Sequence, residues 1–122
     1  MKKILFVEDE AALQEAVGIS LEQKGYKVVR ALDGEAGFRS AKTENPDLIL
    51  LDLILPRKDG FEVLENLKKD QDTKDIPVIV LTNLEGMKDV EKAISLGAVS
   101  YLVKTDYDLK EMLKKIEEII EK

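Results

Sequence analysis

Five short apolar runs alternate with segments of helical periodicity along this chain, and this alternation constrains its fold more than any other feature. The predicted strands lie at Ile4–Val7, around Val28 and Val29, and at Leu48–Leu51, Val78–Leu81 and Tyr101–Val103. Each run is too short for a helix and is followed by an amphipathic segment. Strands and helices in this order form a parallel sheet with helices on both faces and right-handed crossovers. The sequence therefore predicts an α/β fold, a doubly wound (βα)5 parallel sheet with strand order 2-1-3-4-5.

The segments between the runs have recognisable helix ends. Asp33 and Asp59 are placed to cap the second and third helices, and Glu62, three residues after Asp59, completes a capping-box pattern. Asn45-Pro46 ends the second helix and Gly97 the fourth. The last segment carries the strongest helical stripe, formed by Leu109, Met112, Leu113, Ile116 and Ile120.

The third apolar run ends in a carboxylate. Leu48–Leu51 leads directly into Asp52, and Leu53-Ile54-Leu55 stays apolar until Pro56 and Asp59-Gly60 indicate a turn. A continuous aliphatic run is typical of a strand buried on both faces, which places Asp52 at the C-terminal edge of the sheet. Because a charge among apolar residues is costly unless it is paired, we expect Asp52 to have a partner.

Other polar residues also follow predicted strands. Glu8 and Asp9 come after the first strand, Thr82 ends the fourth, and Lys104 follows the fifth. In an open parallel sheet, ligands bind beyond the C-terminal strand ends where the strand order reverses, which is here the crevice between the first and third strands. We therefore expect three carboxylates to converge in that crevice, with Thr82 and Lys104 on the same edge.

This group of residues favours phosphoryl chemistry with a metal ion. Three carboxylates repel each other unless a cation lies among them, and oxygen ligands suit Mg²⁺. Asp52 is placed to act as a nucleophile towards phosphorus, since carboxylates form acyl-phosphate intermediates. Lys104 supplies a positive charge, and Thr82 supplies a hydroxyl donor, for the phosphoryl oxygens.

Composition narrows the other classes of function. The chain has 122 residues, no cysteine and no histidine, which excludes disulfides, imidazole bases and the usual zinc sites. Its net charge of -6 argues against nucleic acid as a direct partner. No signal peptide or membrane span is recognisable, so we expect a cytoplasmic protein that does not bind membranes. We expect residues 1–122 to form a single domain without an output domain.

Each of these residues also has a purely structural interpretation. Asp9 is suited to cap the first helix, and Thr82 to cap a turn. A lone lysine such as Lys104 is usually a surface residue, and a lone aromatic such as Tyr101 is usually strand packing. The joint placement at strand ends favours the functional interpretation.

The chain resembles the receiver domains of two-component response regulators, above all the single-domain, chemotaxis-regulator-like members. The resemblance covers essentially the whole chain and depends on Val7-Glu8-Asp9, on Asp52 with Leu55-Pro56 and Asp59-Gly60, on Thr82, and on Tyr101 with Lys104 three residues later. It implies a flavodoxin-like receiver fold and a signalling domain that is not an enzyme in the ordinary sense.

The resemblance also implies a role for each site residue. Asp52 is the expected phosphoacceptor, and Asp9 and Asp52 are expected to bind Mg²⁺ by their side chains. Glu8 is expected to act on the ion through water, and Ile54 through its main-chain carbonyl. Thr82 and Lys104 are expected to bind the phosphoryl group. The implied donor is the phosphohistidine of a sensor histidine kinase or of a phosphotransfer protein.

The resemblance further implies a switch and a limited signal lifetime. Thr82 is expected to move towards the phosphoryl group while Tyr101 turns inward, which reshapes the surface of the fourth helix, fifth strand and fifth helix for a downstream protein target. Ile54 and Leu84 are expected to flank the path of the hydrolytic water. Because neither side chain orients water, we expect slow autodephosphorylation.

Two positions depart from the family pattern. Thr105 follows Lys104 in place of a proline that the family holds in a cis peptide bond, and a non-proline cis bond costs about 2.5–4 kcal/mol. The isomer of this bond is therefore an open question. Asn83 follows Thr82 in place of a very small residue, which affects access of the phosphoryl group.

Three alternative functions share parts of this pattern. A haloacid dehalogenase-type phosphatase needs a second acid two residues after the nucleophile, where this chain has Ile54. A flavodoxin needs a hydroxyl- and glycine-rich phosphate loop, where Glu8-Asp9-Glu10 repels phosphate. A receiver-like interaction module that works without phosphorylation stays open.

Overall fold

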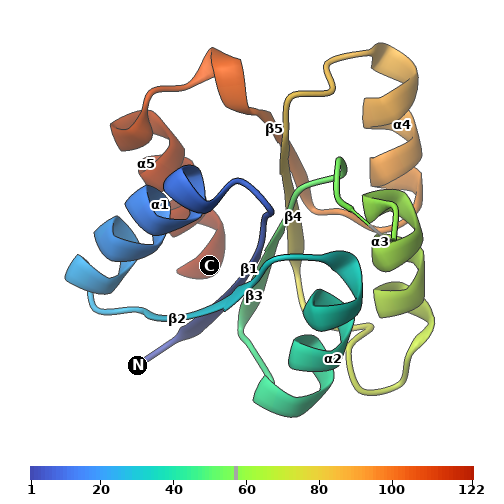
Figure 1. Cartoon of the computed structure of the whole chain (residues 1–122), viewed down its shortest axis with the longest axis horizontal. Helices are drawn as coiled ribbons and strands as arrows, with labels where there is room; N and C mark the ends of the chain where they lie inside the picture. The colour runs from blue at the N-terminus through green and yellow to red at the C-terminus, as the bar shows by residue number, and fades with distance from the viewer. Residues whose placement is uncertain (57) are drawn as a thin grey trace.

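Five parallel strands form one sheet in a computed structural model that describes residues 1–56 and 58–122. The strands are β1 (Lys3–Val7), β2 (Lys27–Ala31), β3 (Leu48–Leu51), β4 (Val78–Thr82) and β5 (Ser100–Val103). Their order in the sheet is β2-β1-β3-β4-β5, and every neighbouring pair is parallel (Figure 1). The predicted fold class and strand order are confirmed.

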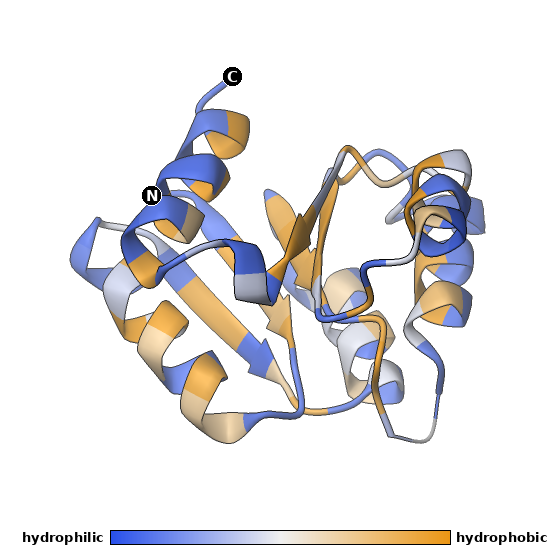
Figure 2. Ribbon diagram, turned by 90° about the horizontal axis from the view of Figure 1, so that it is seen from above, coloured by the Kyte–Doolittle hydropathy of each residue, from blue (hydrophilic) through white to orange (hydrophobic). Residues whose placement is uncertain are grey.

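Helices cover both faces of this sheet. They are α1 (Ala11–Gln23), α2 (Gly34–Glu44), α3 (Gly60–Lys69), α4 (Met87–Ser95) and α5 (Leu109–Ile120), with a short 3-10 helix, η1 (Lys104–Asp106), before α5. In Figure 1, α1 and α5 lie on one side of the sheet, and α2, α3 and α4 lie on the other. Seen from above, the apolar strands lie between these two helical layers (Figure 2).

The strands contribute to two separate cores, which explains the long apolar runs in β1, β3 and β4. In β1, Ile4 and Phe6 pack with α1 and α5, whereas Leu5 and Val7 pack with α2, α3 and α4. All four residues of β3 are fully buried. Successive side chains of a strand point to opposite faces, so a strand covered on both sides needs an apolar residue at every position.

One of the two predicted caps has a different geometry. Asp33 caps α2 as expected, and its carboxylate accepts a hydrogen bond of 2.8 Å from the Ala36 amide. Asp59 caps α3, but it accepts from the amide of Phe61, two residues on, at 2.7 Å. The predicted capping box with Glu62 is therefore wrong, because the Asp59 carboxylate is already used by the nearer amide.

The capping box occurs at α5 instead. The Asp108 carboxylate accepts from the Glu111 amide at 2.8 Å, and the Glu111 carboxylate accepts from the Asp108 amide at 3.0 Å. This reciprocal pair satisfies two backbone donors at the start of the helix. It fixes where α5 begins after the β5 strand end.

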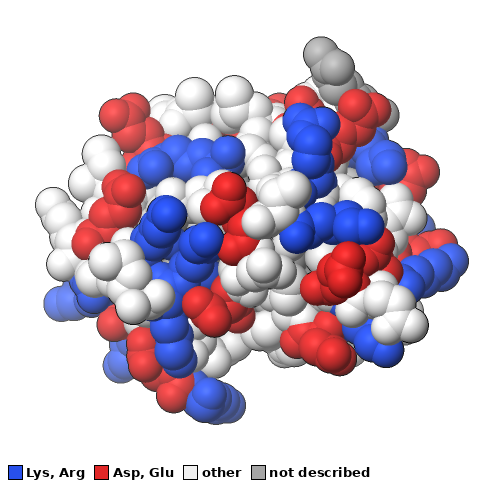
Figure 3. Space-filling model, turned by 90° about the horizontal axis from the view of Figure 1, so that it is seen from below, with Lys and Arg blue, Asp and Glu red and all other residues white. Residues whose placement is uncertain are grey.

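Acidic and basic side chains interleave on the face shown in Figure 3. Surface ion pairs such as Lys24–Glu117 at 3.0 Å and Lys3–Glu44 at 3.3 Å contribute little to stability, about 0–1 kcal/mol each. In the described ranges, no helix has both the length and the apolar content to cross a bilayer.

Gly60 allows the loop after β3 to fold back on itself. Its amide donates to the Leu53 carbonyl at 3.0 Å. A Cβ atom at position 60 would clash with Leu53 Cα and would lie 2.5 Å from the Asp52 carbonyl oxygen. Because both neighbours are backbone atoms, they cannot move aside as a side chain does. The glycine therefore sets the path of the chain directly after Asp52.

Gly60→Ala should lower the free energy of unfolding by roughly 1–3 kcal/mol, the range expected for overpacking. Urea denaturation of the parent and the variant measures this difference. Gly86→Ala is the matched control, because its Cβ would meet only the Asp89 carboxylate, at 3.2 Å. Equal losses in the two variants would contradict the close approach at Gly60.

Candidate functional site

Three carboxylates meet at the C-terminal edge of the sheet. Glu8 and Asp9 follow β1, Asp52 follows β3, and one oxygen from each lies within 4.8 Å of the others. The Asp52 amide donates to the Val7 carbonyl at 3.1 Å, which continues the pairing of β1 with β3. Glu8 is fully buried and Asp52 is 3% exposed, whereas Asp9 is exposed. The strand order thus brings the three acids together, although they are far apart in the sequence.

These carboxylates line a pocket of about 350 Å³, which we call the acidic pocket. Its lining residues are Glu8, Asp9, Glu10, Asp52, Ile54, Asn83 and Lys104. Six of the nine residues named as site candidates from the sequence therefore face one space. Thr82, Leu84 and Tyr101 do not line it.

Lys104 bridges the two buried acids. Its Nζ lies 2.7 Å from Glu8 Oε1 and 2.9 Å from Asp52 Oδ2, and its side chain is 12% exposed. The chain reaches this position through a trans bond, because no described peptide bond is cis. Lys104 opens the η1 turn and still points into the crevice. Its interpretation as an ordinary surface lysine is therefore wrong.

Asp52 is held at both of its oxygens. Oδ2 accepts from Lys104 Nζ at 2.9 Å, and Oδ1 accepts from the Ile54 amide at 3.1 Å. These contacts fix the orientation of the carboxylate in a site that is almost closed to solvent. The expected partner of Asp52 is thus a pair of donors, one charged and one from the backbone.

Burial dominates the electrostatics of Glu8. It raises the pKa of Glu8 to about 7, although the contact with Lys104 and the hydrogen bond from the Glu10 amide act in the opposite direction. Burial alone would lower the pKa of Lys104, but its hydrogen bonds to Glu8 and Asp52 raise the pKa above its usual value. The lysine therefore stays charged next to a carboxyl group that is costly to ionise.

Thr82 and Tyr101 meet at the loop after β4. Thr82 is fully buried, and the Leu84 amide lies 3.5 Å from its Oγ1. The Tyr101 hydroxyl donates to the Leu84 carbonyl at 2.7 Å, and burial raises the pKa of Tyr101 to about 12. Leu84 thus connects the two residues that were named as switch candidates.

Gln14 is a positioning residue that the sequence analysis missed. It is 4% exposed, and its Nε2 donates to the carbonyls of Phe6, Glu8 and Ala31 at 3.2, 3.1 and 2.9 Å. It ties α1 to the ends of β1 and β2. Gln14 lies three residues before Val17, on the apolar face of α1. A polar residue on an apolar face was the sequence signal that could have identified it.

Asp9 does not cap α1. The N-cap residue is Glu10, and its side chain makes no capping hydrogen bond. The Glu10 amide donates instead to Glu8 Oε2 at 3.1 Å. The capping interpretation of Asp9 is therefore wrong, and its exposed carboxylate is free of that role.

Comparison with known proteins gives one consistent result. The family model described as "Response regulator receiver domain" matches residues 4–117. This chain belongs to the response regulator receiver domain family. Membership removes the phosphatase and flavodoxin alternatives, and it identifies a signalling domain of two-component systems.

Individual relatives of this receiver domain are regulators. The DNA-binding dual master transcriptional regulator RpaA of Synechocystis is 42% identical over 120 residues, which is 98% of this chain and 49% of RpaA. Mn²⁺-bound response regulator Rcp1 is 38% identical, with a TM-score of 0.87 over 97% of this chain and 93% of Rcp1. The Vibrio cholerae chemotaxis protein CheY4 is 27% identical, with a TM-score of 0.89 over 98% of each chain.

The exclusion of nucleic acid from the partners has to be corrected. RpaA is a DNA-binding regulator by name, and this receiver domain spans about half its length. The net charge of -6 describes only these 122 residues. A charge argument applies to the surface that carries the charge, and it cannot exclude DNA binding by a partner chain or by another domain.

The acidic pocket fits a hard divalent cation. Its carboxylates offer only oxygen ligands, and one ligand atom from each of Glu8, Asp9 and Asp52 lies within 4.8 Å of the others. A relative with this fold, Rcp1, has been solved with Mn²⁺ bound. Receiver domains as a class bind such ions, and the three acids are consistent with that property.

The raised pKa of Glu8 predicts a specific pH dependence of stability. A carboxyl group with a folded-state pKa near 7 and an unfolded value of 4.5 stabilises the fold fully below pH 4.5, and this contribution is lost as pH rises to 7. The prediction concerns the free energy of unfolding of the metal-free parent minus that of Glu8→Gln. This difference should fall by on the order of 2 kcal/mol as pH rises from 4.5 to 7.

Urea denaturation at several pH values without divalent metal measures this difference. Glu10→Gln is the control, because it removes a neighbouring charge from an exposed position. A parent-minus-variant difference for Glu8→Gln that is flat or rises with pH would contradict the effect of burial.

Proposed function

We propose that this receiver domain accepts a phosphoryl group on Asp52 from the phosphohistidine of a partner kinase or phosphotransfer protein, in an Mg²⁺-dependent reaction. The observation that carries the proposal is the Asp52 carboxylate, which is nearly buried, held by Lys104 and the Ile54 amide, and adjacent to Glu8 and Asp9. A carboxylate in this setting is oriented as a nucleophile. The family assignment supports the same chemistry.

In the proposed step, an Asp52 oxygen attacks phosphorus while the P–N bond of the phosphohistidine breaks. The electron pair of that bond returns to the imidazole nitrogen. Lys104, which lies 2.9 Å from Asp52 Oδ2, is close enough to hold a phosphoryl oxygen, and Thr82 supplies a hydroxyl from the end of β4. Asn83 lines the acidic pocket, so it adds an amide donor at the entrance.

A bound Mg²⁺ would neutralise charge on the phosphoryl oxygens and on the cluster of acids. Asp9 and Asp52 are the proposed side-chain ligands, Ile54 contributes its carbonyl, and Glu8 acts through water. Glu8 is rigidly placed for this role by the hydrogen bonds of Gln14 and of the Glu10 amide.

The proposed output is a shift in population at the surface of α4, β5 and α5. Thr82, Leu84 and Tyr101 form a connected path from the site to β5 through the contacts of 3.5 and 2.7 Å. Helix α4 is the loosely held element of this surface, since Ala93 is its buried residue while Met87 and Ile94 are exposed. A phosphoryl group that draws Thr82 towards Asp52 would therefore reshape this surface with little loss of core packing.

Intact-mass measurement after incubation with Mg²⁺ and acetyl phosphate tests this function. The parent should gain one phosphoryl group, and Asp52→Asn should gain none. Asp106→Asn, an exposed change, is the control and should react like the parent. Asp9→Ala should need a higher Mg²⁺ concentration for the same yield. A parent without any adduct would favour the interaction module that works without phosphorylation.

The phosphorylated form should decay slowly. Ile54 and Leu84 carry apolar side chains beside the site, and neither can hydrogen-bond the water that attacks phosphorus. The double variant Ile54→Asn with Leu84→Glu should speed decay on the order of tenfold, which corresponds to about 1.4 kcal/mol. Decay of the adduct in Mg²⁺ buffer, followed by intact mass, gives the rates.

The matched control for this lifetime is Ile54→Leu with Leu84→Ile, which keeps both side chains apolar. Its decay should remain close to that of the parent. If the polar double variant decays no faster than this control, these two positions do not govern hydrolysis.

A further inference from the structure

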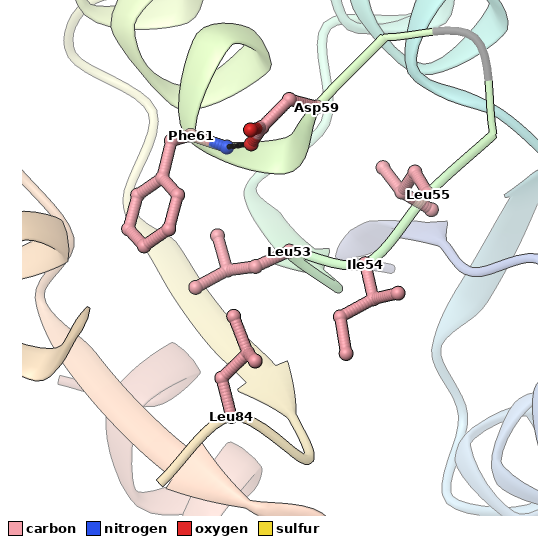
Figure 4. A pocket seen from close by; sticks show the side chains of 6 residues that line it. All are labelled: Leu53, Ile54, Leu55, Asp59, Phe61 and Leu84. Atoms are coloured by element: carbon pink, nitrogen blue, oxygen red, sulfur yellow. Dashed lines mark hydrogen bonds between the residues drawn. The ribbon is translucent and has the colours of Figure 1, made fainter. Parts of the chain in front are cut away.

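A second pocket lies beside the acidic one, and most of its lining residues have no role in the proposed function. It has a volume of about 360 Å³, at the small end of ligand pockets. Its walls are Leu53, Ile54, Leu55, Asp59, Phe61 and Leu84 (Figure 4). We call it the apolar pocket, because five of its six lining residues are apolar. It is formed by the loop after β3, the start of α3 and the loop after β4.

The two pockets share one wall. Ile54 lines both of them, and its amide donates to Asp52 Oδ1 at 3.1 Å. The Ile54 side chain is 52% exposed, so it forms an open rim and does not separate the two spaces. A molecule whose phosphoryl group lies at Asp52 is thus able to extend over Ile54 into the apolar pocket.

We propose that the apolar pocket binds the acyl tail of acyl phosphates, and that this receiver domain accepts phosphoryl groups directly from donors with a neutral, apolar tail of about four to six carbons. This inference rests on the proposed function of Asp52. The donor's phosphoryl group lies at the acidic pocket, and its tail crosses Ile54 towards Phe61 and Leu84.

The reaction balances without another reactant. An Asp52 oxygen forms a bond to phosphorus as the bond from phosphorus to the donor's carboxyl oxygen breaks. The electron pair of that bond leaves with the acyl group as a carboxylate, so no proton or redox partner is needed. The products are the Asp52 acyl phosphate and the free carboxylate of the tail.

The apolar lining of this pocket selects against an anionic tail. Asp59 is the one charged residue among its described lining residues, and its Oδ1 accepts from the Phe61 amide. Lys92 Nζ lies 4.3 Å from the centre of the Phe61 ring, so the charges near the pocket are of both signs. A tail that ends in a carboxylate would have to leave water for the apolar walls, whereas a neutral tail gains contact with Phe61 and Leu84.

The experiment compares the rates of phosphorylation by acetyl, butyryl, hexanoyl and succinyl phosphate at one Mg²⁺ concentration, measured as early adduct formation by intact mass. Full burial of one methylene group raises the binding affinity about fourfold. An open pocket that retains half of that free energy raises the affinity about twofold for each methylene. Hexanoyl phosphate should therefore react on the order of tenfold faster than acetyl phosphate. Succinyl phosphate should react more slowly than butyryl phosphate.

Variants of the pocket locate the tail. Leu84→Ala and Phe61→Ala should each lower the ratio of hexanoyl to acetyl rates by at least about threefold. The ratio within one variant is the readout, so a change that affects both donors cancels. Ile19→Ala is the matched control, because Ile19 is an exposed apolar residue that lines a different pocket, between α1 and β2. Its ratio should equal that of the parent.

Each result separates this inference from the function on which it rests. No adduct from any donor would remove the proposed role of Asp52. If acetyl phosphate gives an adduct but the ratio of hexanoyl to acetyl rates is near one, the proposed role of Asp52 stands and the tail site is overturned. The apolar pocket would then be left to bind a side chain of a partner protein. A high ratio that survives both Leu84→Ala and Phe61→Ala would also overturn it, since the tail would bind elsewhere.

Discussion

The ion pairs of Lys104 are the interaction on which the rest of the site depends. Two carboxylates, those of Glu8 and Asp52, are buried at adjoining strand ends, and each would be costly there without a partner. Lys104 contacts both, at 2.7 and 2.9 Å. Loss of one member of such a buried group costs about 3–5 kcal/mol, because it leaves an uncompensated charge. The lysine thus permits a concentration of negative charge that suits a divalent cation, and its own positive charge suits the oxygens of the proposed phosphoryl group.

In the proposed switch, one core holds the site in place and the other core carries the helix that moves. Gln14 lies beside the core of α1 and α5 and holds the ends of β1 and β2, so Glu8 is firmly placed. Helix α4 belongs to the other core, where it buries Ala93 and contacts α3 through Lys92, whose Nζ is 4.3 Å from the centre of the Phe61 ring. A cation–π contact at an exposed site is worth about 0.5–1 kcal/mol. The helix is thus the least costly element to shift.

Sequence patterns predicted most of the fold because they report on backbone topology. Apolar runs and turn residues were enough for the strand order, and the strand order placed Glu8, Asp9, Asp52 and Lys104 on one edge. What they missed depends on side-chain direction. The local path of the chain decides whether the Asp59 carboxylate accepts from the amide two residues on or from the amide three residues on. The hydrogen bond from the Tyr101 hydroxyl to the Leu84 carbonyl joins residues that are 17 positions apart, so no local pattern predicts it. The net charge could not exclude DNA as a partner, because it describes only these 122 residues.

Leu84 is the residue where the site, the proposed switch and the apolar pocket meet. Its amide faces Thr82 Oγ1, its carbonyl accepts from Tyr101, and it lines the apolar pocket. Coupling free energies are reciprocal. A ligand that prefers one position of the loop after β4 therefore changes the equilibrium between two positions of Tyr101, and the position of Tyr101 changes the affinity of the ligand by the same free energy. A ligand that contacts only the wall around the buried Leu53 would gain affinity without altering the proposed switch. In the proposed reaction, the tail of a phosphodonor that reaches Leu84 would therefore act on the same element as the phosphoryl group that it delivers.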